Sequence, residues 1–220
     1  MSDASTAEAT TVDADQLAEL LRADPRAAAA RLLQAAKRGD IEAQAIYAQM
    51  LSEGRGVPCD AIEALHWYTL AANCRHAGAM NMVGRCHDLG HGTAASGELA
   101  AAWYRRAAEC GSLWGMYNYA NLLATGRGVR ADVARAFRWY LRAAERGHAK
   151  SMNLVGRCYE EGLGVETDIA VAHRWYEKSA EAGDFRGQRS LAAVLLEAGR
   201  ADEAAYWLRR AVEAKAAAYR

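Results

Sequence analysis

Four Trp-Tyr pairs recur at a constant interval of 36 residues along this chain of 220 residues. They are Trp67-Tyr68, Trp103-Tyr104, Trp139-Tyr140 and Trp175-Tyr176. Self-similarity at a fixed period of about 20 to 50 residues is the signature of repeat proteins, whose units pack only on their neighbours. A catalytic pocket needs a few unique residues that converge once, whereas repeated units lay similar residues along an extended surface. The interval therefore predicts a binding scaffold with its site in the groove between repeats.

Glycines follow the same interval in two further phases. The first phase comprises Gly39, Gly111, Gly147 and Gly183, with Arg75 as its single exception. The second phase comprises the pairs Gly54/Gly56, Gly90/Gly92, Gly126/Gly128 and Gly162/Gly164. A fifth copy is contracted, because Ala204, Trp207 and Ala211 repeat the earlier Ala-x-x-Trp pattern four residues early. We expect a shortened loop around Gly199 before this last copy.

Apolar residues within each unit have the spacing of two helices. In the first unit they are Ala43, Ile46, Tyr47, Met50 and Leu51, followed by Ala64, Trp67, Ala71 and Ala72. A glycine closes the last turn of each first helix, at Gly54, Gly90, Gly126 and Gly162, where a residue without a Cβ adopts the left-handed conformation easily. Side-chain oxygens that cap orphan amides open the second helices, at Asp60, Ser96, Asp132 and Asp168. Strand signals are absent, so the predicted fold class is all-α.

The repeated string is specific enough to resemble a known family. It reads Gly-x-Gly-Val-x-x-Asp-x-x-x-Ala-x-x-Trp-Tyr-x-x-Ala-Ala at Gly54 to Ala72 and Gly126 to Ala144, and nearly so at Gly162 to Ala180. Over roughly residues 35 to 214 the chain resembles the Sel1-like repeat, a relative of the tetratricopeptide repeat. The resemblance implies an α-solenoid of antiparallel helix pairs with a concave face, and family members typically act as adaptors rather than catalysts. Unit two departs from the pattern, with Thr93 for the loop valine and Arg75 for the interhelix glycine.

The resulting domain organisation is a short tail, a cap and five units. Residues 1–14, rich in Ala, Ser and Thr, are predicted to be a disordered tail. Capping helices are expected over 15–38, a short one around Leu17 to Leu21 and one from Asp24-Pro25 to about Arg38. The repeats are placed at 39–74, 75–110, 111–146 and 147–182, with a shortened unit at 183–214 that ends in a C-terminal helix to about residue 220.

The repeated tryptophans are interpreted as packing residues. They are Trp67, Trp103, Trp139, Trp175 and Trp207. A tryptophan buries about 150 to 250 Å², on the order of 4 to 6 kcal/mol before entropy is charged. One helix pair cannot bury such a ring alone, so stability requires stacked neighbours. The alternative is that the rings form a stacking platform for bases or sugars.

Charge and hydropathy exclude several classes of partner. Lys plus Arg and Asp plus Glu both number 27. That balance argues against nucleic acid or an anionic membrane as partners, since both require a basic surface. No apolar run approaches membrane-spanning length, and the first residues lack the basic start and apolar stretch of a secretory signal.

The cysteines discriminate between branches of the family that the chain resembles. In one secreted branch, some members of which are reported to bind or cleave β-lactams, a disulfide in each repeat joins the second helix to the next first helix. The matching positions here are Ala72/Met80, Ala108/Met116, Ala144/Met152 and Ala180/Gln188, so that framework is missing. The chain instead has Cys59, Cys74, Cys86, Cys110 and Cys158. An odd count at non-pairing positions fits a reducing compartment, so we expect a cytoplasmic protein with free, mostly buried thiols.

Residues with catalytic or metal-binding chemistry are sparse. Cys86, His87 and His91 form the one local cluster of ligand types, and the two histidines have i, i+4 spacing. His87 stands at a packing position, however, and Gly90 intervenes near the helix end. We therefore expect neither metal nor cofactor, although Cys86, His87 and His91 leave metal binding open. No nucleophile stands in a recognisable motif, so an enzyme is not expected.

Polar and aromatic residues that flank the core positions of the first helices are the candidate binding residues. They are Asn81, Arg85, Trp114, Tyr117, Asn121, Asn153, Arg157 and Arg189, with Lys150 and Arg186 in the phase of Trp114. Units two and four carry nearly the same hexamer, Asn81 to Cys86 and Asn153 to Cys158. Asparagines can pair with a peptide backbone, and arginines can bind carboxylates. The alternative is a solvated face with i, i+3 pairs between Arg85 and Asp88 and between Arg157 and Glu160.

The predicted function is that of a non-catalytic adaptor that binds a protein or an extended peptide in its concave groove. A monomer is favoured, although the sequence leaves the oligomeric state open. Two alternatives remain. One is a β-lactam-directed enzyme or accessory, like the cysteine-rich secreted branch. The other is a structural protein that self-assembles through the alanine-rich helix from Ala201 to Ala218.

Overall fold

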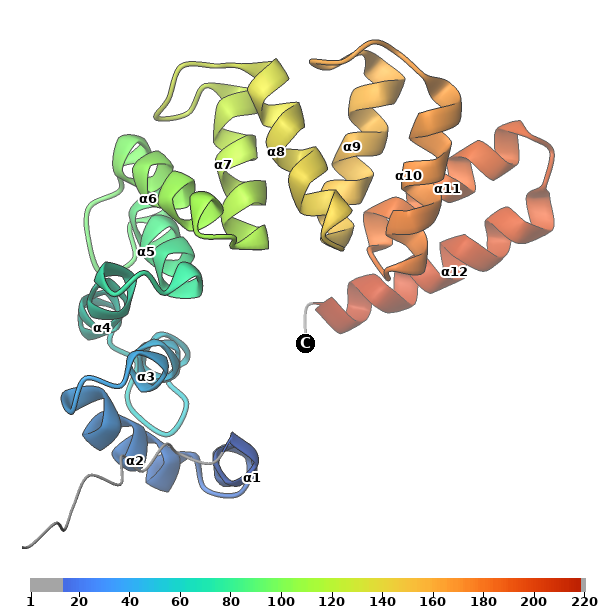
Figure 1. Cartoon of the computed structure of the whole chain (residues 1–220). Coiled ribbons are helices and arrows are strands. Elements are labelled where there is room, and N and C mark those ends of the chain that lie inside the picture. The colour runs from blue at the N-terminus through green and yellow to red at the C-terminus, as the bar shows by residue number, and fades with distance from the viewer. Residues whose placement is uncertain (1–13, 219–220) are drawn as a thin grey trace, which may run out of the picture.

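The computed structural model of the chain describes residues 14–218, which form twelve helices and no strand in that range. Consecutive helices pack as antiparallel neighbours, and the array curves into an open arc (Figure 1). The helices are α1 Ala14–Ala23, α2 Pro25–Lys37, α3 Ile41–Glu53, α4 Ala61–Asn73, α5 Ala77–Leu89, α6 Gly97–Glu109, α7 Leu113–Thr125, α8 Val133–Glu145, α9 Ala149–Glu161, α10 Ile169–Glu181, α11 Phe185–Glu197 and α12 Ala201–Ala218. The all-α solenoid expected from the repeats is confirmed. The predicted tail lies outside the described residues except for residue 14, which begins α1.

Helix ends follow the local signals in the sequence. The first helices α3, α5, α7 and α9 end at Gly54, Gly90, Gly126 and Gly162, each with a left-handed φ between 66° and 74°. The second helices begin after Asp60, Ser96, Asp132 and Asp168, whose side chains accept from backbone amides of the first turn. In the N-terminal cap, Asp24 accepts from two amides of α2, which begins at Pro25. These caps satisfy amides that a helix leaves without partners.

The second glycine of each loop sets how closely neighbouring units approach. A Cβ on Gly92 would overlap the backbone carbonyl of Ala61, at the start of the preceding second helix. A Cβ on Gly128 would likewise overlap the backbone of Gly97, again 31 residues earlier. At this glycine the loop therefore packs directly against the backbone of the previous unit, which explains why glycine recurs there.

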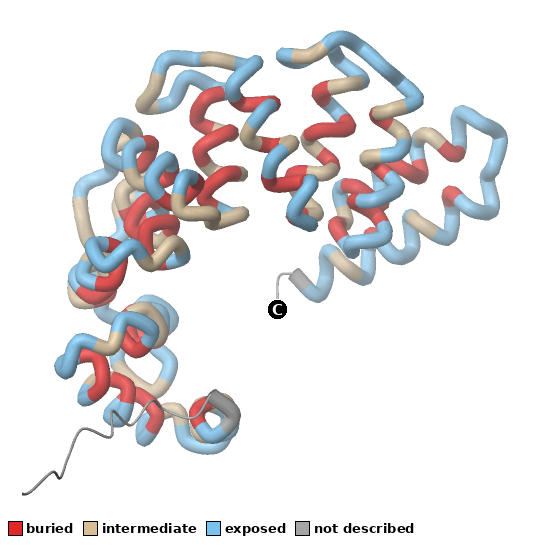
Figure 2. Tube along the Cα trace, in the orientation of Figure 1, coloured by how far each residue is buried: buried red, intermediate tan, exposed pale blue. Residues whose placement is uncertain are grey.

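The tyrosine of each Trp-Tyr pair lies deeper than the tryptophan. Tyr68, Tyr104, Tyr140 and Tyr176 are at most 5% exposed. Trp67 is also buried, whereas Trp103, Trp139, Trp175 and Trp207 are only partly buried. Figure 2 shows the buried residues in red along the helices, while exposed residues cover the loops and the remaining parts of the helices. The two rings of a pair thus share the packing, with the tyrosine innermost.

The repeated hexamer has a packing explanation. A Cβ on Gly84 would lie 2.6 Å from the ring of Tyr104, and one on Gly156 would lie 2.5 Å from the ring of Tyr176. The hydroxyl of Tyr176 donates to Glu160 Oε2 at 2.6 Å, one turn further along α9. Glycine in the hexamer therefore makes room for the tyrosine of the same unit.

The cysteines form no disulfide, and all five have free thiols. Cys86 and Cys158 are buried and Cys110 is partly buried, but Cys59 and Cys74 are exposed. The prediction of mostly buried thiols was therefore wrong for these two, because Cys59 lies in a loop and Cys74 at the end of α4. No helix in the described part of the chain is long and apolar enough to cross a membrane.

Candidate functional site

The first helices line a hollow of about 720 Å³ in the N-terminal half, which we call the first hollow. It lies between α3 and α5, with contributions from α4 and the start of α7. Its buried lining includes Tyr68 and Ala79, and its exposed lining includes Glu53, Arg85 and Trp114. Apolar area and charged groups of both signs therefore lie along one continuous depression.

A second hollow of about 370 Å³ lies beside it in the C-terminal half. It is formed where the N-terminal ends of α7, α9 and α11 come together, with Ala214 of α12. Lys150 and Arg186 supply positive charge, and Asp184 supplies negative charge. We call this the second hollow.

Trp114 lines both hollows and is 47% exposed. Its ring meets the edge of Tyr117 at 5.9 Å between centroids and that of His148 at 4.8 Å. The ammonium of Lys150 lies 4.6 Å from the centre of the ring. An exposed tryptophan held in position by three neighbours is a preorganised aromatic contact for a partner.

Two histidines in equivalent positions, 72 residues apart, have different environments. His76 accepts from the amide of Ala79 through Nδ1, and its Nε2 lies 3.2 Å from Glu42 Oε2. His148 is only 8% exposed, and its Nδ1 lies 2.8 Å from Ser151 Oγ, while Nε2 is buried without a partner. Burial, with a smaller effect of the nearby Lys150 charge, lowers the pKa of His148 to about 4. The ring is therefore neutral near pH 7.

Two asparagines among the candidate binding residues are buried between helices. Asn81 and Asn153 are 7% and 4% exposed. Asn118 Nδ2 donates to Asn81 Oδ1 at 2.9 Å, and Ser190 Oγ donates to Asn153 Oδ1 at 3.0 Å. These bonds join α5 to α7 and α9 to α11. The recurrence of asparagine in this phase thus has a structural role in joining successive first helices.

Of the other predicted residues, only some remain open to a partner. The amide oxygen of Asn121 accepts from the Tyr140 hydroxyl at 2.6 Å. Arg85 is exposed and makes no ion pair or side-chain hydrogen bond within residues 14–218, and Arg189 is exposed on α11. Arg85 and Trp114 line the first hollow together with the buried Asn81. Tyr117, Asn121, Asn153, Arg157 and Arg189 line neither hollow.

The ion pairs expected on a solvated face are replaced by others. Arg157 binds Glu161 at i, i+4, at 3.2 Å from Nε to Oε1, rather than Glu160. The side chain of Glu160 instead accepts from Tyr176. The i, i+3 pairs of the solvated-face alternative do not form, because Tyr104 and Tyr176 of the second helices donate to Asp88 and Glu160, the next-to-last residues of α5 and α9.

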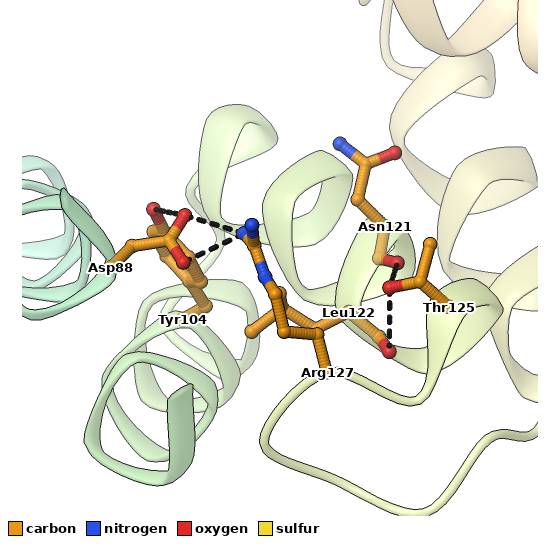
Figure 3. Close-up of polar contacts among 6 residues, drawn as sticks. All are labelled: Asp88, Tyr104, Asn121, Leu122, Thr125 and Arg127. Atoms are coloured by element: carbon orange, nitrogen blue, oxygen red, sulfur yellow. Dashed lines mark hydrogen bonds and ion pairs between the residues drawn. The ribbon is translucent and has the colours of Figure 1, made fainter. Parts of the chain in front are cut away.

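Asp88 illustrates the same point at the junction between units two and three. Nη2 of Arg127 donates to both carboxylate oxygens of Asp88, at 2.7 and 2.8 Å, and the Tyr104 hydroxyl donates at 3.4 Å (Figure 3). Asp88 is only 14% exposed at its side chain. The loop after α7 is thereby tied to α5, and Asp88 does not form the pair with Arg85 that the alternative of a solvated face includes.

Cys86, His87 and His91 do not assemble into a metal site in the structure. Cys86 is buried, His87 is partly buried with its Nδ1 lacking a partner, and His91 is exposed in the loop. No group of three or more His, Cys, Asp or Glu side chains suited to a metal ion occurs among the described residues.

Several residues that line the hollows were not identified from the sequence, among them Glu42, His148, Asp184 and Phe185. A signal was present, because His76 and His148 stand where Asp40, Ser112 and Asp184 begin the other first helices. A histidine at the N-cap of the first helix, present in alternate units as His76 and His148, marks the junctions where the hollows form.

Comparisons with known proteins agree with this architecture. The family model of the Sel1 repeat matches residues 41–76, 77–112, 115–148, 149–184 and 195–215, which is more than half of the chain. No curated protein matches the sequence significantly.

Among solved structures, the chain is similar to a Sel1 repeat protein from Oxalobacter formigenes, with 29% identity and a TM-score of 0.78 over 84% of this chain and 76% of that one. It is also similar to a protective antigen with an SLR fold present in uropathogenic Escherichia coli strains, with 27% identity and a TM-score of 0.76 over 86% of this chain and 42% of that one. An immunity protein from Pseudomonas aeruginosa shares the fold alone, with 15% identity and a TM-score of 0.58 over 90% of this chain and 82% of that one. The interval of the Trp-Tyr pairs, the capped helix pairs and these matches lead to one conclusion: the chain belongs to the Sel1 repeat family.

Proposed function

We propose that this chain is a non-catalytic interaction scaffold that holds an extended segment of a protein partner in the first hollow, with Trp114 as its aromatic anchor. Sel1 repeat proteins are generally protein-protein interaction scaffolds. The first hollow is continuous from α3 to the start of α7 and offers an apolar lining beside exposed charges. This combination is the single observation that carries the proposal.

Two side chains give the hollow the character of a binding surface. Arg85 is exposed, without an ion pair in the described structure, and free to bind a carboxylate of the partner. Trp114 offers an exposed ring of the kind that dominates interface energetics. Asn81 contributes to the wall, where it is already bonded to Asn118.

This proposal leaves out several of the candidate binding residues on the first helices. Arg157 is paired with Glu161 and lines neither hollow, so breaking that pair would offset part of any gain from a partner. The segment is therefore proposed to run over units one to three, whose residues line the first hollow.

A selection from a peptide library against the full chain, followed by calorimetry with the selected peptide, tests the proposal. Arg85→Ala and Trp114→Ala should each weaken binding by about tenfold or more. Arg189→Ala is the matched control, because this exposed arginine lies outside both hollows, and it should leave affinity unchanged. Equal loss in all three variants, or loss only in the control, would place binding elsewhere.

Self-assembly through α12 is a second candidate that one observation favours. Leu208 and Val212 are 43% and 70% exposed, although their counterparts one unit earlier, Tyr176 and Ala180, are buried. Sedimentation at several concentrations, with Val212→Glu as the variant, tests this candidate. A monomer at all concentrations would exclude it, and a hydrolysis assay with a β-lactam tests the enzymatic alternative.

A further inference from the structure

The second hollow gathers charged and aromatic groups that the packing of the array does not require. Lys150 lies over the ring of Trp114 at 4.6 Å, and the guanidinium carbon of Arg186 lies over the ring of Phe185 at 4.7 Å. Neither cation forms an ion pair among the described residues. Two cations therefore stand on aromatic faces at the edge of one cavity, available to an anion.

The backbone adds hydrogen-bond donors at the same place. The first turns of α7, α9 and α11 meet in this hollow. Ser112 and Asp184 cap α7 and α11 through their side chains, but α9 receives no side-chain cap. The first amides of α9 are thus left for water or a ligand, and the positive end of a helix dipole favours an anion.

His148 supplies an independent sign that a ligand belongs here. The side chain lines the hollow, is 92% buried, and has no partner at Nε2. A buried polar atom without a partner is rare in folded proteins. At the equivalent junction, the corresponding nitrogen of His76 lies against Glu42 Oε2. At His148 the position of Glu42 is taken by Trp114, so the carboxylate that satisfies one histidine is absent at the other.

The charge of the hollow selects the class of anion. Lys150 and Arg186 contribute two positive charges and Asp184 one negative charge, while burial lowers the pKa of His148 so that its ring is neutral near pH 7. A net charge of about +1 matches a single carboxylate better than a phosphate, which carries about two charges at pH 7. The volume of about 370 Å³ and the rings of Trp114 and Phe185 suit one acidic side chain with apolar neighbours.

We propose that the second hollow binds the carboxylate of a glutamate or aspartate in a partner peptide, held by Lys150, Arg186 and the first amides of α9. The Nε2 of His148 donates to the same carboxylate when Ser151 donates to Nδ1. This site is separate from the first hollow, shares only Trp114 with it, and does not depend on the function proposed above.

Titration of the full chain with two blocked peptides tests the site. Acetyl-Leu-Glu-Leu-amide should bind saturably and shift the indole resonance of Trp114, while acetyl-Leu-Gln-Leu-amide should bind at least about tenfold more weakly, as expected for loss of charge-assisted bonds. Inorganic phosphate at equal ionic strength is the third ligand and should also bind more weakly. Equal binding of the two peptides, tighter binding of phosphate, or no saturation up to about 10 mM glutamate peptide would each overturn the proposal.

Matched variants distinguish the site from general attraction to positive charge. The double variant Lys150→Ala/Arg186→Ala should bind the glutamate peptide at least about tenfold more weakly. The control is Lys178→Ala/Arg106→Ala, because Lys178 and Arg106 also lie over tryptophan rings, at 4.5 and 4.2 Å, but outside the hollow. Equal weakening by both doubles would refute a defined site. Arg85→Ala should leave this peptide unaffected, so that failure here and failure of the first hollow remain distinguishable.

Discussion

Two junctions of the array occupy equivalent positions 72 residues apart but differ in what meets their histidine. Before α5, His76 caps the helix through Nδ1 and contacts Glu42 through Nε2, so both ring nitrogens have partners beside the first hollow. Before α9, His148 meets Trp114 instead and retains an unpartnered nitrogen beside a hollow. The helices around both are alike, and the residue 34 positions earlier, Glu42 or Trp114, differs together with the presence of a partner at Nε2 of the histidine. Repetition fixes the backbone, and departures from it create sites.

The tryptophans of units one and three should contribute equally to the free energy of unfolding. Trp67 meets Tyr47 edge-on at 5.9 Å, and Trp139 meets Tyr119 at 6.0 Å. We expect Trp67→Ala and Trp139→Ala each to cost about 3 kcal/mol of unfolding free energy. Trp207→Ala should cost less, because the ring lies on the last described helix and is partly exposed. Urea denaturation midpoints in the reverse order would contradict the nearest-neighbour packing.

The buried His148 should make the protein sensitive to acid. The pKa of His148 is about 4 when folded and about 6.5 when unfolded, so the unfolded chain binds the proton more readily in this window. The stabilisation is complete above pH 6.5 and is lost as pH falls towards 4, by about 3 kcal/mol at most. Denaturation across this range measures it.

His148→Ser is the matched control for acid sensitivity, since Ser112 caps α7 from the equivalent position. This variant should lose most of the slope. A smaller loss of stability at low pH should remain in this variant, because burial also lowers the pKa of His87. A slope unchanged in the variant would mean that His148 does not carry the effect.

Exchanging the residue that meets the histidine should convert one junction towards the other. Trp114→Glu places a carboxylate in the position that Glu42 has relative to His76. The pKa of His148 should rise by at least one unit, which is about 1.4 kcal/mol. An NMR titration of the His148 ring protons measures the change. An unaltered pKa would show that the backbone holds the two histidines differently.

The smallest expected effect concerns the residue just before each histidine. Arg75 has φ 65°, the only positive φ of a non-glycine residue in the described chain, whereas Gly147 has φ 93° at the equivalent position. Arg75→Gly should stabilise the protein by about 1 kcal/mol, and Gly147→Arg should destabilise it by a similar amount. Nothing lies within 4 Å of a Cβ on Gly147, so the backbone alone is tested. A lower thermal midpoint for Arg75→Gly, or a higher one for Gly147→Arg, would contradict this prediction.

The sequence predicts well those features that depend on neighbouring residues. The glycines that end the first helices and the aspartates that cap the second act within one turn, so their types alone locate them. Which member of a Trp-Tyr pair lies deeper is different, because both are aromatic and they point only about 100° apart on the helix. The answer depends on how each helix is rotated against the next, which repeated residues do not specify.

Candidate site residues were harder to predict for the same reason. Asn81 and Asn153 appeared to face a groove, but the rotation between units places them against Asn118 and Ser190, 37 residues later. The exposure of Arg85 and Trp114 agrees with their expected place on the first helices. The cap position of His148 was readable, but its environment depends on Trp114 in the previous unit.

The loop glycines have a consequence for how such a chain changes in evolution. Each one packs against backbone 31 residues earlier, as Gly92 does with Ala61 and Gly128 with Gly97. The surface that receives each loop glycine therefore consists of main-chain atoms, which every unit possesses whatever its side chains. A duplication or loss of one whole unit leaves each remaining glycine contact intact. The length of the arc therefore changes in steps of one unit. Side chains that face a partner are then free to diverge without disturbing how the units join.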